Sequence, residues 1–261
     1  MNPTALTLPM RAVKPRETGI TMVIDGGIPL SMFTDLISLG AEYIDYVKFG
    51  WGTALVTNCL REKIGVLAAH GIDFYFGGTL FEKYVLQGRF EDYRGFCEEY
   101  GCRHVEVSNG TIEMSNAEKA GYIRKLAADF DVISEVGFKD PIRSELLPPS
   151  EWIACINEDL DAGASLVTLE ARESGKSGIC RPDGALRYGL VEDVLSAGIA
   201  GGSLLFEAPT TALQTHLITR IGPDVNLGNV PAQGVIGTET LRLGLRADTL
   251  TAFEQRYSEQ G

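Results

Sequence analysis

TMVID at residues 21–25 opens a series of eight short apolar runs that decides the fold. Each run is rich in Val, Ile, Leu, Phe or Tyr and ends on or beside a charged or polar residue. The other seven are YIDYVKFG (43–50), IDFYFGG (72–78), HVEVSNG (104–110), VISEVGFK (132–139), LVTLEARE (166–173), SLLFEAP (203–209) and DVNLGNV (224–230). The segment between each run and the next has room for a helix, a pattern typical of buried parallel strands. Eight such units predict an α/β fold, a (β/α)8 TIM barrel, whose chemistry lies at the carboxyl ends of its strands.

The whole chain of 261 residues fits one such barrel. We expect an N-terminal extension over 1–19, a C-terminal tail over 250–261, and a single domain between them. Helices are predicted at 29–39, 58–69, 89–100, 115–130, 150–162, 184–197, 211–221 and 239–247. Ser115 and Glu118 have the spacing of a capping box at the start of one of these helices. The polar, proline-containing segment 139–149 follows the fifth strand, and we interpret it as a lid.

The charge of the chain argues against two classes of partner. Its 23 Lys and Arg against 35 Asp and Glu give a net charge of −12, which disfavours nucleic acid and anionic membranes. A small anionic substrate must therefore be held by local cations. Residues 1–19 contain no apolar segment of a secretion signal, and no run approaches the length of a membrane span. We expect a cytoplasmic protein.

The cysteines and histidines do not form a recognisable site in the sequence. The five cysteines are odd in number and widely spaced, and no pair has the spacing of a zinc knuckle. The three histidines lie far apart, outside any zinc-binding pattern. The sequence therefore disfavours a histidine-based zinc site and a Ser-His-Asp triad.

Polar side chains stand instead at the end of nearly every predicted strand. Burying such charges unpaired costs several kcal/mol, so their recurrence at one end of the barrel predicts an active site there. They are Asp25, Lys48, Glu106, Asn109, Glu135, Lys139, Glu170, Arg172, Glu173, Glu207, Asn226 and Asn229.

Several of these residues have a structural alternative. Lys48 is expected to bind an anion, or to pair with Asp25 or Asp45. Arg172 can clamp a carboxylate, phosphate or sulfonate, or belong to a network with its flanking glutamates. Lys139 can act in catalysis, or bridge to a nearby carboxylate. Asparagine is also common where a chain leaves a strand. Segments 77–79 and 228–229 are candidate loops for close approach to a phosphate.

The strand ends also resemble those of a known family, phosphosulfolactate synthase, over about residues 14–250. The matching motifs are VKFGWGT (47–53), FGGTLFE (76–82), VEVSNGTI (105–112), SEVGFKD (134–140), EARESGKSG (170–178), FEAP (206–209), VNLGNV (225–230) and ETLRLGLRADT (239–249). The resemblance implies a (β/α)8 lyase that adds sulfite to phosphoenolpyruvate with Mg2+. It also implies a homo-oligomer, with a trimer favoured.

The resemblance gives the strand-end residues specific roles. Lys139 is expected to protonate C2 of an enediolate formed when sulfite attacks C3, with Lys48 and Arg172 as further catalytic cations. A divalent cation, Mg2+ or Mn2+, is expected on at most two or three carboxylates. We assign it to Glu135, Glu170 and Glu207. The expected substrate-binding residues are Asp25, Gly78, Glu106, Asn109, Asn226 and Asn229.

Two positions depart from the family pattern. Gly26 and Phe138 stand where the family typically has lysine. Each lost cation is worth up to about 4 kcal/mol beside a substrate charge at an effective dielectric near 20. One alternative is therefore a diverged enzyme with a less charged acceptor, and another is a non-catalytic, stress-associated relative. The retained Lys48, Lys139 and Arg172 favour an enzyme.

Overall fold

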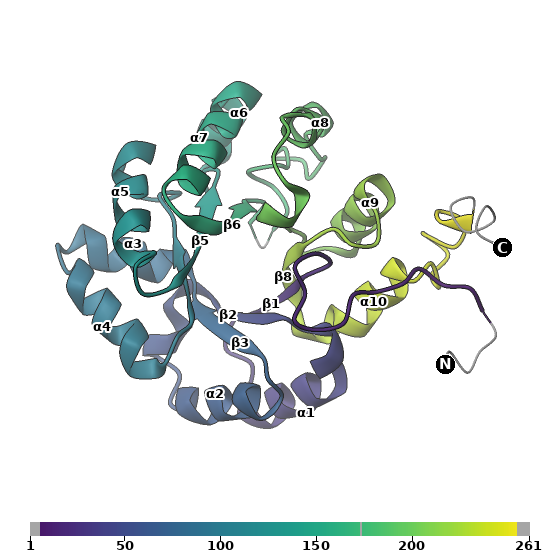
Figure 1. Cartoon of the computed structure of the whole chain (residues 1–261), viewed down its shortest axis with the longest axis horizontal. Coiled ribbons are helices and arrows are strands. Elements are labelled where there is room, and N and C mark those ends of the chain that lie inside the picture. The colour runs from purple at the N-terminus through teal and green to yellow at the C-terminus, as the bar shows by residue number, and fades with distance from the viewer. Residues whose placement is uncertain (1–5, 173, 255–261) are drawn as a thin grey trace.

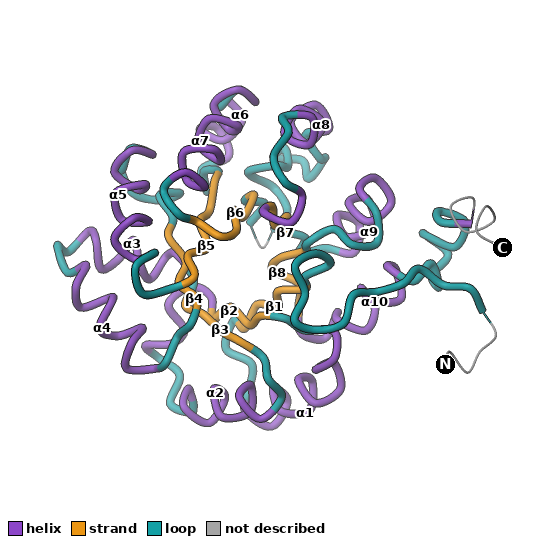
Figure 2. The backbone as a smooth tube through the Cα atoms, in the orientation of Figure 1, coloured by secondary structure: helices purple, strands orange, loops and turns teal. Residues whose placement is uncertain are grey.

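Eight parallel strands form the ring at the centre of the computed structural model, which describes residues 6–172 and 174–254 (Figure 1). The ladder runs β3-β2-β1-β8-β7-β6-β5-β4, and Figure 2 shows the helices outside this ring. The strands are β1 (Thr21–Asp25), β2 (Tyr46–Phe49), β3 (Asp73–Phe76), β4 (His104–Val107), β5 (Asp131–Val136), β6 (Ala164–Leu169), β7 (Leu204–Glu207) and β8 (Leu227–Pro231). The prediction of a single-domain (β/α)8 barrel is confirmed.

The helices alternate with these strands in the order that the sequence predicts. They are α1 (Leu30–Gly40), α2 (Leu60–Ala69), α3 (Gly78–Leu86), α4 (Phe90–Tyr100), α5 (Asn116–Leu126), α6 (Pro141–Leu146), α7 (Pro149–Asp161), α8 (Tyr188–Ser196), α9 (Thr211–Ile221) and α10 (Val235–Arg242). The capping box of α5 is confirmed, because Ser115 accepts from the backbone of Glu118 and Glu118 accepts from the backbone of Ser115.

Two helices were not predicted, and several boundaries differ. Helix α3 begins directly after β3, where the sequence analysis placed a loop, and α6 lies inside the segment interpreted as a lid. The second and eighth strands are shorter than their apolar runs, beginning only at Tyr46 and Leu227. A 3-10 turn, Ala41–Tyr43, occupies the start of the second run. Buried apolar residues outside the strands, such as Ile44 and Val225, also belong to the core, so run length overestimates strand length.

Each strand has one face toward the helices and one toward the barrel interior. Residues such as Val23, Val47 and Phe206 belong to the large core between strands and helices. A smaller cluster fills the barrel interior with Ile20, Met22, Tyr75, Ile133, Leu166 and Leu205. The next interior positions toward the carboxyl ends are charged in four strands, at Lys48, Glu106, Glu135 and Glu207. Because of this alternation, only the strand-end side chains that point into the barrel lie close together at the carboxyl ends of the strands.

The opposite end of the barrel is closed by buried arginines. Arg242 of α10 is fully buried and donates to the carbonyls of Ile20, Pro223 and Val225, joining the starts of β1 and β8. Residues 6–19 form no helix or strand and run beside α10 (Figure 1). Arg11 and Arg16 anchor this segment, through Glu239 at 2.9 Å and Asp45 at 3.0 Å. Among the described residues, no helix has the length and apolar character needed to cross a membrane.

Candidate active site

Seven charged side chains line a small cavity above the interior cluster, at the carboxyl ends of the strands. They are Lys48, Glu106, Glu135, Lys139, Glu170, Arg172 and Glu207. The cavity measures about 30 Å³, enough for a water molecule or two. Its other walls include Ile24, Trp51, Thr79 and Asn229. The predicted concentration of charged residues at this end is therefore present, with four carboxylates facing three cations.

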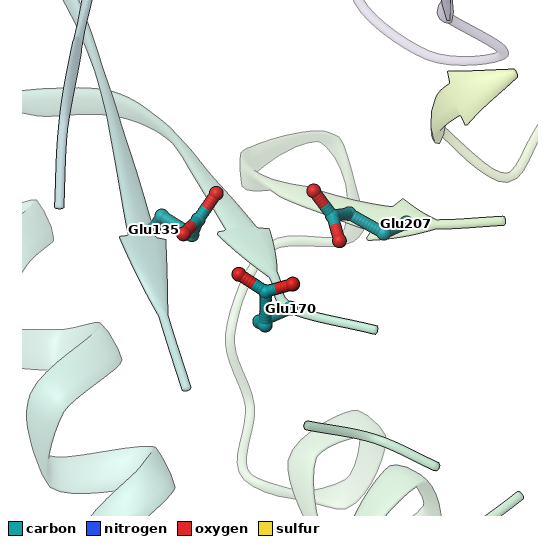
Figure 3. Close-up of side chains that lie close together, drawn as sticks. All are labelled: Glu135, Glu170 and Glu207. Carbon is teal, nitrogen blue, oxygen red and sulfur yellow. The ribbon is translucent and has the colours of Figure 1, made fainter. Parts of the chain in front are cut away.

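Three of the four carboxylates form a compact group. Glu135, Glu170 and Glu207 come from consecutive strand ends and point toward one another (Figure 3). One oxygen from each lies within 4.8 Å of the others, and all three side chains are buried. These are the residues that the sequence analysis assigned to a metal ion.

The three-glutamate group fits a divalent cation. Glu135 Oε1 and Glu170 Oε2 are buried and have no hydrogen-bond partner among the described residues. Burial and the charges of Glu135 and Glu207 raise the pKa of Glu170 well above its usual range. A hard cation with a preference for oxygen ligands would relieve this crowding of negative charge. The buried triad can hold a metal ion.

Lys48 bridges the carboxylates from the other side of the cavity. Its Nζ lies 3.0 Å from Glu106, 3.4 Å from Glu135 and 3.5 Å from Glu207. Burial of this ammonium acts to lower its pKa, but the three carboxylates outweigh burial and raise the pKa well above its ordinary value. Lys48 therefore stays charged and ties the ends of three strands together. The two aspartates considered as its partners pair elsewhere, Asp25 with Lys63 and Asp45 with Arg16.

Glu106 and Glu135 respond differently to this shared environment. Burial raises the pKa of Glu106 to about 7, against the opposing effect of Lys48. Burial also acts to raise the pKa of Glu135, but Lys139 and Lys48 outweigh it and lower the pKa to about 2. Neighbouring carboxylates with pKa values pushed apart are typical of sites that handle protons or cations.

Lys139 and Arg172 form the outer wall of the cavity. Lys139 follows the end of β5 and donates to the Thr79 hydroxyl at 2.8 Å, with Glu135 at 3.9 Å. Burial acts to lower its pKa, but Glu135 and Glu170 outweigh burial and raise it. Arg172 donates to the Lys139 carbonyl at 3.2 Å, and its own backbone N–H donates to Glu170 and Glu207. Glu173, which also stood among the predicted strand-end charges, lies outside the described residues.

Helix α3 contributes a part of the site that sequence reasoning missed. Gly78 opens this helix and donates its backbone N–H to Glu106 at 2.5 Å. An added Cβ at Gly78 would overlap the Ser108 hydroxyl, so this close approach requires glycine. Glu82 on the same helix is buried and accepts from Ser108, Gly110 and Thr111. It therefore fixes the loop that follows β4.

Three of the expected substrate-binding residues are placed away from the cavity. Asp25 faces the helices and pairs with Lys63 of α2 at 2.5 Å, because its neighbour Ile24 takes the interior position. Asn109 donates to the Met114 carbonyl and stabilises a loop. Asn226 precedes β8 and bonds backbone groups at the opposite end of the barrel. Gly78, Glu106 and Asn229 do line the cavity.

Asn229 bonds to one glutamate of the triad and lines the cavity. Its side-chain amide donates to Glu207, while its Oδ1 is buried and has no hydrogen-bond partner among the described residues. Its backbone has a positive φ of 49°, a conformation that is costly for a residue other than glycine. The structure thus holds an acceptor oxygen toward the cavity, at some conformational cost.

The segment predicted as a lid contains α6 and is tied to its surroundings. Asp140 caps α6 by accepting from the backbone of Arg143, and the Arg143 guanidinium lies 4.2 Å from the centre of the Phe138 ring. Arg187 donates to the carbonyls of Ser144 and Leu147. These contacts define one conformation of the segment, and its movement as a lid stays a prediction.

The folding pattern has distant structural counterparts. The YdjI aldolase from Escherichia coli K12 superposes with a TM-score of 0.53 at 13% identity, covering 94% of this chain and 90% of the aldolase. At this level of identity the likeness concerns the fold alone. It agrees with the barrel described above.

Sequence comparison is far more specific. Residues 9–248 match the family model of (2R)-phospho-3-sulfolactate synthase (ComA). The phosphosulfolactate synthase of Bacillus subtilis is 50% identical over 95% of this chain and 99% of that protein. The phosphosulfolactate synthase of Methanothermobacter thermautotrophicus is 40% identical over 96% of this chain and 98% of that protein. This chain therefore belongs to the phosphosulfolactate synthase family, a family of carbon–sulfur lyases.

Proposed function

We propose that this protein adds sulfite to C3 of phosphoenolpyruvate and releases phosphosulfolactate. The observation that carries the proposal is the convergence of Lys48, Lys139 and Arg172 on a buried three-glutamate group at the active end of the barrel. Two anionic reactants repel each other, so their union requires cations arranged in advance. Membership of the family supports the same reaction.

The proposed chemistry forms one C–S bond and moves one proton. The sulfur lone pair of sulfite attacks C3, and the C2–C3 π electrons move onto the carboxylate as an enediolate. Lys139 then gives a proton to C2 and recovers one from solvent. Lys139 suits this role because its ammonium is charged, only 26% exposed, and fixed by Thr79. Arg172 lies beside it and binds an anionic group of the reactants, since guanidinium suits carboxylate and phosphate geometry.

The proposed ligands of Mg2+ or Mn2+ are Glu135, Glu170 and Glu207. The Lys48 ammonium neutralises part of the negative charge of Glu135 and Glu207. A divalent cation supplies neutralisation of the charge that develops on the substrate carboxylate. Four carboxylates and three cationic side chains line the cavity, so the protein alone offers no surplus of positive charge to two anions. This balance favours a metal-dependent reaction.

The sequence also supports an alternative acceptor, one that carries less charge than phosphoenolpyruvate. Gly26 and Phe138 replace the lysines typical of the family, and Phe138 is covered by Arg143. An enoate acid with less charge than phosphoenolpyruvate would need fewer cations. The same residues and the same conjugate addition would serve that acceptor.

Incubation of the purified protein with phosphoenolpyruvate, sulfite and Mg2+, followed by mass spectrometry of the products, tests the proposal. A product with the summed mass of the two reactants supports it. If the protein consumes an enoate acid without a phosphate group and does not consume phosphoenolpyruvate, the result favours the second acceptor. Absence of any sulfite adduct would contradict both.

We also propose a cytoplasmic homo-oligomer, with a trimer favoured by the family resemblance. A sedimentation mass of one 28.3 kDa chain would contradict the assembly. The reactants are small anions, and the net charge of −12 disfavours nucleic acid and anionic membranes as partners.

A further inference from the structure

Backbone strain is concentrated around the active-site cavity. Within residues 6–172 and 174–254, three residues other than glycine have positive φ: Trp51 at 51°, Arg172 at 56° and Asn229 at 49°. All three line the cavity. Such conformations cost on the order of 1–3 kcal/mol each and cluster at functional sites. Arg172 and Asn229 hold their positions through hydrogen bonds to neighbouring groups, whereas no such role explains Trp51.

Trp51 lines both the active-site cavity and a larger outer pocket. The outer pocket, of about 400 Å³, lies over the ends of β1 and β8 and shares Ile24, Trp51 and Asn229 with the deep cavity. Its other lining residues are uncharged, among them Gly26, Ile28 and Gln233. The Trp51 side chain thus borders both a small charged cavity and a larger uncharged pocket.

The indole of Trp51 lies directly on the backbone of Gly26. A Cβ added at position 26 would overlap Trp51 Cζ3, so this arrangement needs a residue without a side chain. The indole is half exposed, at 51%, and makes no hydrogen bond or ring contact with other described residues. Gly50 and Gly52 flank it, which leaves the turn conformational freedom. The indole is therefore the least restrained large group around the cavity.

The deep cavity by itself is too small to enclose the proposed acceptor. A three-carbon acid carrying a phosphate does not fit into about 30 Å³. Lys139 is bonded to Thr79, and Lys48 is paired with three carboxylates, so moving either breaks charged contacts. Moving Trp51 would change its packing on Gly26 and would break none of these charged contacts.

We propose that Trp51 and Gly26 together form a specificity-determining gate for the acceptor. The indole resting on Gly26 closes the deep cavity, and a planar, three-carbon enol acid reaches the carboxylates from the outer pocket when the indole lifts. The gate itself is independent of the proposed function, whereas naming phosphoenolpyruvate as the entering acid rests on that function. The absence of a side chain at position 26 thus has a consequence beyond the lost charge: it permits the closed position.

Fluorine NMR of protein labelled with 5-fluorotryptophan tests the gate without substrate. The chain has two tryptophans, Trp51 and the fully buried Trp152, and Trp51→Phe assigns the two resonances. Gly26→Ala should displace the Trp51 resonance and leave that of Trp152 in place, which also verifies the fold. Gly65→Ala is the matched control, because an added Cβ there on α2 meets nothing within 4 Å. An unmoved Trp51 resonance in Gly26→Ala would overturn the gate.

Phosphoenolpyruvate with Mg2+ and no sulfite is the second probe. It should shift the wild-type Trp51 resonance toward its position in Gly26→Ala. If the open form makes up about one tenth of the wild-type protein, Gly26→Ala should lower the apparent dissociation constant by up to about tenfold. A displaced resonance in Gly26→Ala together with no response to phosphoenolpyruvate in either protein would support the gate and contradict the named acceptor.

If Gly26→Ala does not fold, the steady-state kinetics of Trp51 variants still test the gate. Trp51→Ala should lower KM and also lower kcat, because the acceptor enters freely while water is no longer excluded during the reaction. Trp51→Phe keeps an aromatic ring over Gly26 and should lie closer to wild type in both constants. Wild-type values of both constants in Trp51→Ala would overturn the gate.

Discussion

The Lys139 ammonium donates a hydrogen bond to the Thr79 hydroxyl over 2.8 Å, joining the loop after β5 to the start of α3. This contact fixes the direction of the proposed proton donor. Lys139→Ala should therefore lower kcat by ~10²–10⁴, the usual contribution of general acid catalysis. Steady-state kinetics should show a smaller change in KM, because the transferred proton matters mainly in the transition state.

Lys139→Arg distinguishes proton transfer from simple anion binding. Guanidinium keeps the charge but scarcely releases a proton near neutral pH, so kcat should stay low in this variant. A raised KM in Lys139→Ala, with kcat unchanged and KM restored by arginine, would move the acid role to another residue. Lys48 would then be the next residue to test.

Lys48 is predicted to stabilise the fold as well as the site. Lys48→Met leaves Glu106, Glu135 and Glu207 buried without their shared cation, and this should cost about 3–5 kcal/mol of unfolding free energy. Urea denaturation measures the change. The matched control is Arg61→Met, which removes an exposed ion pair with Glu99 and should cost less than about 1 kcal/mol. Equal losses in the two variants would show that the three carboxylates do not depend on Lys48.

Metal binding should depend on the three-glutamate group and favour hard cations. Isothermal titration with Mn2+ should show at least about tenfold weaker binding in Glu170→Gln than in wild type. Glu113→Gln, at a side chain that is 94% exposed, should bind as wild type does. Excess EDTA should abolish activity, and Mg2+ or Mn2+ should restore it. Full activity in EDTA, with no metal retained by the protein, would rule out a metal-dependent reaction.

The contribution of Glu106 to the free energy of unfolding should decrease as pH rises. Its pKa is raised from 4.5 to about 7, so the folded state holds this proton more tightly than the unfolded state does. The stabilising effect is complete below the unfolded pKa and is lost as pH rises through the folded pKa. Between about pH 5 and about pH 8, wild type should lose on the order of 1–3 kcal/mol relative to Glu106→Gln. Denaturation of both proteins at the two pH values measures this difference, and a pH-independent difference would contradict the raised pKa.

The barrel could be predicted from the sequence because it follows from regular spacing, whereas the assignment of a cation to Glu135, Glu170 and Glu207 followed from the family resemblance. Each apolar run ended near a strand end, and Glu135, Glu170 and Glu207 stand at or beside the ends of three consecutive strands. Asp25 was predicted to bind substrate, because the sequence does not determine strand parity: both Ile24 and Asp25 stand at the end of an apolar run. The structure assigns Ile24 to the cavity and Asp25 to Lys63.

Other parts of the site depended on contacts that spacing does not reveal. Asn226 lies just before β8, at the opposite end of the barrel, because the eighth strand begins later than its apolar run. Helix α3 begins with Gly77 and Gly78, which suggest a loop, although the amphipathic residues that follow them could have indicated a helix. The packing of Trp51 on Gly26 joins residues from different strand ends, and only the three-dimensional structure brings them together.

Carbon-13 NMR of phosphoenolpyruvate labelled at C3, incubated in D2O with sulfite, Mg2+ and the protein, tests the conjugate addition most directly. We expect the C3 resonance to move to that of a methylene bonded to sulfur, with one deuterium at C2 and none at C3. Lys139→Ala should form the same product far more slowly. An unchanged C3 resonance under these conditions, or deuterium incorporated at C3, would contradict addition of sulfite at C3 with proton delivery to C2.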